Sequence, residues 1–349
     1  MEKRHTISEV HRELYKLLKK EKDPLIMLLL RSAFEAGKKM DNKIRQYQNN
    51  YDLEWWEKNR LTGGAINGLD NRPDVGFELF PPEIQKILCD NFVVSYPKAG
   101  RTWLKILLVK YFQLHFGLKI KERAVFTKPH AIRKETGNDS VPIIKFEHML
   151  GIINDIDNGK DWAEKLNIMN LSSAYRLTNV VLLCRDPRAI LVSMYFHQSH
   201  RLVGKYQYKG PLTEFIYKNE CLDRIIKYYN AWAEYKHVPK NFLLIRYEDL
   251  YKDTKGVLKL IVEFLGIENI NENHLIAAVK FASFNSMKKM ERANIFGSGA
   301  MGLVDKDDNE SFKVRQGKID GYLDYLSDDD LVFINKKMEK LNPFFGYNK

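Results

Sequence analysis

Short apolar runs that end abruptly and lead into helical patterns recur through the middle of the chain. The first run, residues 92–94, is broken at Pro97, passes through a loop and enters the apolar helical pattern of residues 104–109. Two later runs, residues 180–184 and 242–245, contain no polar residue, which is typical of strands buried on both faces. The pattern predicts strands that are each followed by a turn and a helix.

The pattern changes towards the N-terminus. Apolar residues recur at helical spacing from Ile7 to Leu18, and Pro24 separates them from a second apolar helix that runs roughly to Phe34. We therefore predict a helical extension over residues 1–88 and a main domain over residues 89–349. The main domain ends in a further helical pattern over residues 331–341, after a capped start at Ser327.

The loop after the first apolar run carries groups that bind anions. Lys98, Arg101 and the Thr102 hydroxyl surround a predicted helix start, where backbone N–H groups and the positive end of the helix dipole point outward. A phosphate or sulfate group fits such a site. The loop is not a Walker A loop, because its lysine precedes Gly100 instead of following a glycine.

Charge and composition narrow the ligand class. The 349 residues are 44% hydrophobic and 29% charged, which allows a substantial core, and the net charge of +11 favours acidic partners. The basic residues are interspersed with acidic ones, and no zinc-finger or RNA-binding motif accompanies them. We therefore expect a polyanionic small ligand and no nucleic acid.

Cysteine usage and the N-terminus indicate the compartment. The three cysteines show no C-x-x-C pair, so the sequence predicts neither a disulfide framework nor a cysteine zinc site. The N-terminus lacks the apolar core of a signal peptide, and residues 25–30 are too short to span a bilayer. We predict a soluble, cytoplasmic protein that has no membrane partner and requires no metal.

Residues 96–103, Y-P-K-A-G-R-T-W, resemble the phosphosulfate-binding loop of the sulfotransferases that use 3′-phosphoadenosine 5′-phosphosulfate (PAPS). Later segments resemble the same family in the same order. Arg185 and Ser193 match an R-[ND]-P-x-[DA]-x-x-x-S segment, and Y-E-D-L at residues 247–250 precedes A-S-F-N-S-M-K at 282–288. Within residues 312–322, four residues match the family form F-x-R-[KR]-G-x-x-G-[DG]-[WY], namely Arg315, Gly317, Gly321 and Tyr322.

This resemblance implies a single α/β domain with a central parallel sheet flanked by helices, related to the P-loop nucleotide kinases. It implies that PAPS and its product PAP are bound by Lys98, Ala99, Gly100, Arg101, Thr102, Trp103, Arg185, Ser193, Tyr247, Ser283, Phe284, Arg315, Gln316 and Gly317. Gln316 replaces the family's usual lysine, which should weaken the 3′-phosphate clamp by about 1–2 kcal/mol. Lys313 or Lys318 could compensate.

The acceptor base has two candidates. Lys145 and His148 end a strand-like segment, where the animal cytosolic sulfotransferases carry K-T-H, but they stand three residues apart instead of two. His130 has the K-x-H spacing with Lys128 in a less strand-like context. An imidazole with a pKa near 6.5 can take the proton of a hydroxyl acceptor, and Glu147 or solvent could serve an amine. We favour His148, with Lys98 and Lys145 as the other catalytic candidates.

We therefore expect an enzyme that moves the sulfuryl group of PAPS to a hydroxyl or amine of a small-molecule acceptor, such as a natural product. The extension, with Trp55 and Trp56, either packs onto the main domain or lines the acceptor pocket. Two alternatives differ in kind. A non-catalytic PAP-binding scaffold would keep the cofactor motifs without a working base, and a nucleotide kinase would need a Walker A lysine and a metal-binding acid.

Overall fold

The structure, a computed structural model, describes residues 91–118, 140–142, 144–148, 175, 178–202, 204–218, 220–295 and 304–348. The chain divides into two units after Leu88, and every described residue belongs to the second unit. The predicted N-terminal extension and His130 lie outside the described residues. No helix that the structure describes is long and apolar enough to cross a membrane.

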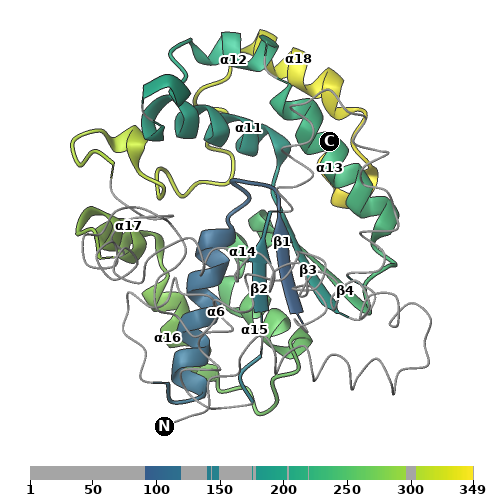
Figure 1. Ribbon diagram of the computed structural model, residues 1–349, viewed down its shortest axis with the longest axis vertical. Coiled ribbons are helices and arrows are strands. Elements are labelled where there is room, and N and C mark those ends of the chain that lie inside the picture. The colour runs from purple at the N-terminus through teal and green to yellow at the C-terminus, as the bar shows by residue number, and fades with distance from the viewer. Residues whose placement is uncertain are drawn as a thin grey trace, which may run out of the picture. The chain divides into compact units, whose positions relative to one another are not determined.

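The described strands form a parallel sheet in the order β2-β1-β3-β4 (Figure 1). They are β1 (Asn91–Ser95), β2 (Ile144–Glu147), β3 (Asn179–Cys184) and β4 (Asn241–Arg246). In the register, Val94 of β1 lies opposite Glu147 of β2 and Leu182 of β3. β2 lies on one side of β1, and the next strand along the chain, β3, lies on the other side. In α/β sheets, ligands bind in the crevice at the carboxyl ends of the strands where the strand order reverses in this way, which here is the end of β1.

Helices follow β1, β3 and β4, as the sequence pattern predicts. The longer ones are α6 (Arg101–His115), α11 (Pro187–Phe196), α13 (Cys221–Tyr235), α15 (Thr254–Phe264), α16 (Glu272–Phe281), α17 (Phe284–Arg292) and α18 (Asp328–Met338). Shorter ones are α12 (Leu212–Lys218), α14 (Tyr247–Lys252), the π-helix η2 (His197–Arg201) and the 3-10 turns η3 (Gly204–Tyr206), η4 (Asn309–Ser311) and η5 (Pro343–Phe345).

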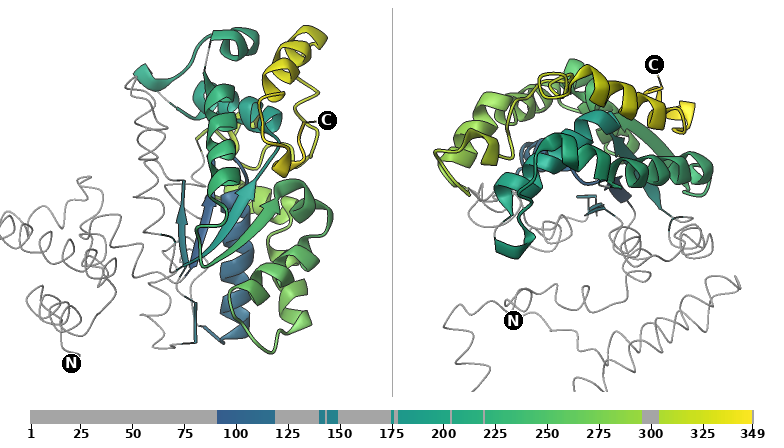
Figure 2. Two further views of the ribbon diagram at one scale, coloured as in Figure 1. Left: turned by 90° about the vertical axis from the view of Figure 1, so that its right-hand side faces the viewer. Right: turned by 90° about the horizontal axis from the view of Figure 1, so that it is seen from above.

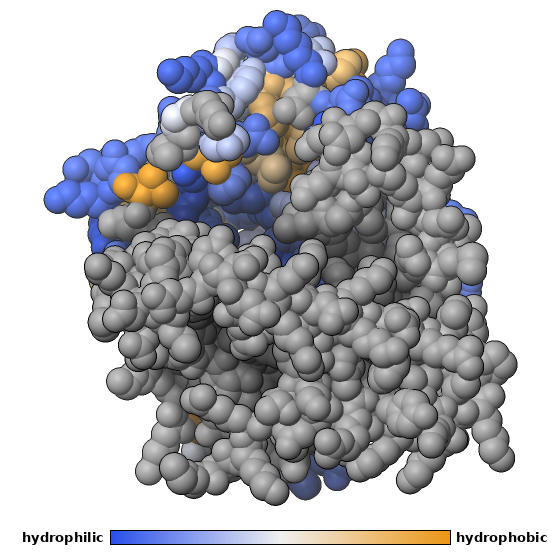
Figure 3. Space-filling view, viewed as in Figure 1, coloured by the Kyte–Doolittle hydropathy of each residue, from blue (hydrophilic) through white to orange (hydrophobic). Residues whose placement is uncertain are grey.

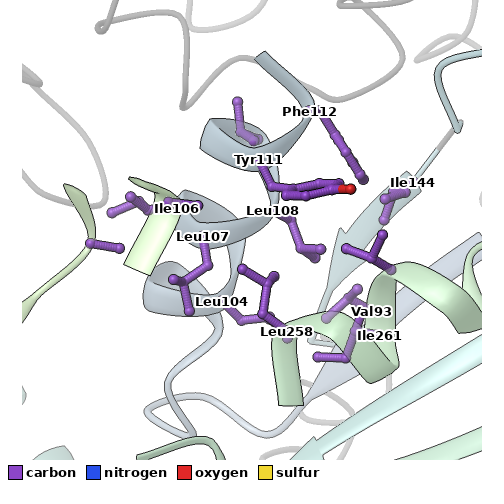
Figure 4. Packing of buried hydrophobic residues seen from close by; sticks show 14 of the residues in the cluster. Val93, Leu104, Ile106, Leu107, Leu108, Tyr111, Phe112, Ile144, Leu258 and Ile261 are labelled. Atoms are coloured by element: carbon purple, nitrogen blue, oxygen red, sulfur yellow. The ribbon is translucent and has the colours of Figure 1, made fainter. Parts of the chain in front are cut away.

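One face of the sheet packs against α6, α15 and α16 (Figure 1). Because side chains alternate along a strand, Val93 and Ile144 point towards this face, where they meet Leu107 and Leu108 of α6 and Ile261 of α15 (Figure 4). All of these side chains are almost fully buried. The result is a rigid base under the N-terminus of α6.

The opposite face is covered by aromatic residues. The Trp232 ring of α13 stacks on Phe242 of β4 and lies 5.6 Å from the Tyr175 ring, which in turn meets Phe92 of β1 edge-on. The C-terminal α18, yellow in Figures 1 and 2, lies beside α13, where Lys337 forms an ion pair with Asp223. Helices therefore flank both faces of the sheet, which confirms the α/β class that the family resemblance implies.

Candidate functional site

The loop between β1 and α6 has the conformation of an anion-binding turn. Lys98 and Gly100 both have positive φ angles, 71° and 101°, so the chain reverses sharply before α6 begins at Arg101. Glycine is required at the second position, because a Cβ atom there would lie 2.5 Å from the Tyr247 ring. The first N–H groups of α6 therefore point into the crevice above β1.

A cavity of about 620 Å³ opens at this point. Its described lining contains six cationic side chains, and no Asp or Glu is among the described residues that line it. The six are Lys98, Arg101, Arg185, Lys313, Arg315 and Lys318. On the face shown in Figure 3 the described surface is largely hydrophilic, with patches of apolar residues between. The cavity is therefore suited to a ligand that carries several negative charges.

Three of these cations, Lys98, Arg185 and Lys313, form what we call the loop cluster. Burial, together with the neighbouring charges of Lys313, Arg201 and Arg185, lowers the pKa of Lys98 to about 7. Burial and the charges of Arg201 and Arg101 likewise lower the pKa of Lys313 to about 8. No carboxylate forms an ion pair with these three side chains in the described part of the chain.

Arg185 leaves β3 at the point where α11 begins. Its Nη1 donates to the Lys98 carbonyl at 3.3 Å, and its guanidinium lies 4.4 Å from the Tyr247 ring centre. The Asp186 carboxylate caps α11, so Ser193 lies two turns further along this helix and also lines the cavity. The Arg185 Nε is buried and has no hydrogen-bond partner among the described residues, so it is available to donate to an anionic ligand.

Aromatic side chains build the wall beside Arg185. The Trp103 Nε1 donates to the Ala282 carbonyl at 2.9 Å, and its ring lies 5.5 Å from that of Tyr247. Ser283 caps α17 and places Phe284 in the lining, against Gly317, whose φ of 64° and lack of a side chain leave room for the ring. These rings provide the flat apolar surface that a purine base needs.

Arg315, Gln316 and Lys318 line the same cavity from the C-terminal segment, and we call them the clamp. Each is held by an acid or a tyrosine. The Arg315 Nη1 donates to Glu310 at 2.9 Å and to the Tyr325 hydroxyl at 2.6 Å, and Gln316 donates to the same hydroxyl at 2.8 Å. Lys318 is exposed and forms an ion pair with Asp324. Of the two lysines that could compensate for Gln316, only Lys313 is buried within the loop cluster.

A buried ion pair anchors the start of the clamp segment. Glu291 of α17 is fully buried, accepts a hydrogen bond from Arg201 at 3.1 Å, and accepts the backbone N–H groups of Lys313 and Val314 at 2.7 and 2.9 Å. Arg201 also donates to the Ser311 carbonyl. This arrangement fixes the backbone that carries Lys313 into the cavity.

His148 lies directly after β2 and opposite the end of β1. Because Val94 pairs with Glu147, the next step of the register brings His148 to Ser95. The His148 Nδ1 donates to the Ser95 carbonyl at 2.9 Å, so its Nε2 carries the lone pair in the neutral ring. Burial lowers the pKa of His148 to about 3, with a further contribution from Arg101. The imidazole is therefore neutral at physiological pH and lines the cavity.

The geometry above coincides with a match to a known family. Residues 88–342 match the family model described as the sulfotransferase domain. The chain belongs to the sulfotransferase family. Sulfotransferase 2A6 of Mus musculus is 28% identical over 216 residues, which cover 59% of this chain and 68% of the relative. Cytosolic sulfotransferase 17 of Arabidopsis thaliana is 26% identical over 280 residues, which cover 72% and 73%.

Among solved structures, mouse sulfotransferase SULT7A1 complexed with PAP superposes with a TM-score of 0.45 at 19% identity, covering 72% of this chain and 84% of that one. The family assignment makes this sulfotransferase a PAPS-dependent enzyme. The residues present fit PAPS, since the unpartnered Arg185 donor and the unpaired cations of the loop cluster match its phosphate and sulfate groups.

Two predicted site residues of the sulfotransferase do not reach the cavity. Lys145 is absent from its described lining, and the Lys145 Nζ forms an ion pair with Glu147 at 3.5 Å. Both residues lie on the same face of β2, because side chains alternate along a strand. Ala99 is fully buried below the loop, where its N–H donates to the Tyr96 carbonyl. We therefore omit both from the residues proposed below.

Sequence reasoning missed His197 of the sulfotransferase. The Nδ1 of His200 forms a hydrogen bond with the Asp308 carboxylate at 2.8 Å, and His200 is not among the described residues that line the cavity. His197 lines the cavity, and its Nδ1 is buried without a partner. The signal available in the sequence was its position four residues after Ser193, one helical turn further along the same helix face.

Proposed function

We propose that this sulfotransferase transfers the sulfuryl group of PAPS to a hydroxyl group of a small-molecule acceptor, with His148 as the base. PAPS supplies the activated sulfuryl group. The acceptor hydroxyl has a pKa far above 7 and must lose its proton as it reacts. The observation that carries the proposal is the tautomer of His148. Its Nδ1 is committed to the Ser95 carbonyl, which leaves the Nε2 lone pair for the acceptor proton.

The pKa of His148 depends on the charges around it and should therefore change when an anionic ligand binds. The positive charges of Arg101, Lys313 and Lys98 add to burial in lowering the pKa of His148. An anionic ligand beside these cations offsets their effect, so the pKa of the imidazole rises when the site is filled. His148 then becomes a stronger base at the stage when a proton must be taken up.

The loop cluster and the clamp would bind the two charged ends of PAPS. Lys98 and Lys313, with the N-terminus of α6, would hold the phosphosulfate end and stabilise the charge that develops there. Arg185, Ser193 and Arg315 would hold the 3′-phosphate through charge-assisted hydrogen bonds. Trp103, Tyr247 and Phe284 would enclose the adenine, since all three line the cavity.

The contacts of Glu147 favour a hydroxyl acceptor over an amine. An amine could use Glu147 as its base, but this carboxylate accepts a hydrogen bond from the Tyr175 hydroxyl and pairs with Lys145. His148 is therefore the group better placed to take a proton. Among hydroxyl acceptors we propose phenols and alcohols of natural-product size, which the cavity volume accommodates beside a nucleotide.

Incubation with sulfur-labelled PAPS and a panel of phenols, alcohols and amines tests the proposal. The wild-type protein should label at least one phenol or alcohol. His148→Ala should lower that rate about a hundredfold or more, on general-base magnitudes, without weakening PAP binding. His237→Ala is the matched control, because this histidine is exposed and does not line the cavity.

Three outcomes decide between the alternatives. If His130→Ala causes the loss and His148→Ala does not, the base is His130. If only amines are labelled, and His148→Ala has no effect, the hydroxyl proposal is wrong. If PAP binds tightly and no acceptor is labelled, the protein is a scaffold that binds the nucleotide without turning it over.

A further inference from the structure

Arg101 lies on the side of α6 that faces away from the proposed nucleotide wall. An α-helix has 3.6 residues per turn, so Arg101 and Trp103, two residues apart, project to nearly opposite sides. Trp103 is fixed on the side of Tyr247 and Ala282. Arg101 shares its side with Lys105, whose Nζ lies 5.8 Å from the Phe146 ring centre of β2.

The Arg101 side chain therefore enters the cavity on the β2 side, where His148 also lines it. Within the described residues the Arg101 guanidinium forms no hydrogen bond and no ion pair. The carboxylate that attracts it, Glu147, is already bound by Tyr175 and Lys145. Burial lowers the pKa of Arg101 only to about 10, so the group stays charged at pH 7. A partly buried guanidinium without an ion-pair partner is stabilised by a ligand that provides the counter-charge.

We infer that Arg101 binds the acceptor, and that the acceptor carries an anionic oxygen group, such as a carboxylate, close to the hydroxyl that His148 deprotonates. This inference rests on the proposed function and names its substrate class: hydroxylated small acids. The planar fork of five N–H donors on arginine matches two oxygens of a carboxylate at once. It assigns the Arg101 side chain to the acceptor, whereas the family resemblance assigns Arg101 to the cofactor through its position in the loop.

Matched acid and amide pairs test the inference. The probes are 4-hydroxyphenylacetate with 4-hydroxyphenylacetamide, and 3-hydroxybenzoate with 3-hydroxybenzamide. With PAP-saturated protein, calorimetry should show each acid binding at least about tenfold more tightly than its amide, which is the size of one charge-assisted contact. In transfer assays with labelled PAPS, kcat/KM should show the same preference.

Arg101→Gln should remove the preference for the acid and leave the PAP dissociation constant within about twofold of wild type. Arg101→Lys keeps the charge and should retain part of the preference. Lys110→Gln is the matched control, since it removes a cation from the same helix outside the cavity and should change neither quantity.

The inference is wrong if wild-type protein binds or uses the amides as well as the acids, or if Arg101→Gln weakens PAP binding as much as it lowers kcat/KM. The second result would return Arg101 to the cofactor site. Failure of the proposed function is a separate result, because it would appear as an absence of transfer from PAPS while the acid is still bound more tightly than the amide.

Discussion

The loop cluster and the clamp hold their cations in opposite ways. In the loop cluster, Lys98 and Lys313 are buried, lie among other cations and have lowered pKa values of about 7 and 8. In the clamp, Arg315 is paired with Glu310 and Tyr325, and Lys318 is paired with Asp324 at the surface. The clamp is internally neutralised, whereas the loop cluster is not.

This difference indicates what each end contributes. Gathering buried cations without counter-ions destabilises the empty protein, and an anionic ligand relieves that strain on binding. The loop cluster therefore acts most strongly where negative charge increases during the reaction. The clamp keeps its geometry with or without a ligand, so it should contribute position and affinity more than rate.

The most severe test of this comparison is Lys98→Met. It removes the most strongly perturbed cation and keeps most of its volume, so we expect turnover to fall about a thousandfold, as for other lost electrostatic stabilisers. The unfolding midpoint of the ligand-free protein should stay the same or rise, because a desolvated charge is lost. Transfer assays and thermal melts measure both, with Lys280→Met on the exposed surface of α16 as control. Near-normal turnover would contradict the role of the loop cluster.

Glu291→Ala tests whether the carboxylate that binds the backbone of Lys313 stabilises the fold. Removing this fully buried carboxylate takes away the counter-ion of Arg201 and the acceptor of two backbone N–H groups, so we expect a loss of about 3 kcal/mol in the free energy of unfolding. Urea titration measures the loss. The double variant Glu291→Met with Arg201→Met should recover part of it, since the uncompensated charge is then gone. Unchanged stability in Glu291→Ala would show that the pair anchors nothing.

The pH dependence of PAP binding should separate the two ends without mutation. An anion binds the protonated forms of Lys98 and Lys313, whose pKa values in the free protein are about 7 and 8 and rise in the complex. Affinity should therefore fall as pH rises from 7 to 9, by up to about tenfold per unit for each proton taken up. Calorimetry in buffers of different ionisation enthalpy measures the proton uptake. A flat profile would mean that both lysines are fully charged in the free protein.

The smallest expected effect is at the clamp. Gln316→Lys restores the charge that the family usually carries there and should tighten PAP binding about fivefold, or roughly 1 kcal/mol. It also removes the hydrogen bond from Gln316 to Tyr325. Weaker binding in this variant would show that the neutral network around Tyr325 matters more than the charge, and that the clamp works through geometry alone.

The sequence predicts the parts of the site that lie within one strand, turn and helix. The loop from Lys98 to Trp103 is one such part. The combination of Arg185 and Ser193 is another, because their spacing along a turn and a helix places both side chains at the same cavity. The offset spacing of Lys145 and His148 is explained only by the register of β1 and β2, which brings His148 to Ser95. Strand alternation, by contrast, could have shown that Lys145 shares a face with Glu147.

Partners that are distant in the chain could not be predicted in this way. The ion pair between Arg201 and Glu291 joins residues 90 positions apart, and nothing in either segment's pattern points to the other. Glu291 of that pair also binds the backbone N–H of Lys313, which holds Lys313 at the loop cluster, whereas Lys318 pairs with Asp324 at the surface. A single sequence carries no signal for such long-range contacts, because they depend on how α17 and η2 pack in three dimensions.

The position of β1 between β2 and β3 has an evolutionary consequence. Arg185 and Ser193, which we propose to hold the 3′-phosphate, follow β3, whereas His148 and the Arg101 side chain lie on the β2 side. Substitutions on the β2 side can therefore change which acceptor is used without disturbing the nucleotide. Related proteins with this sheet can therefore evolve different acceptor specificities while they keep the same donor site. Acceptor specificity can be engineered by the same route, through substitutions on the β2 side.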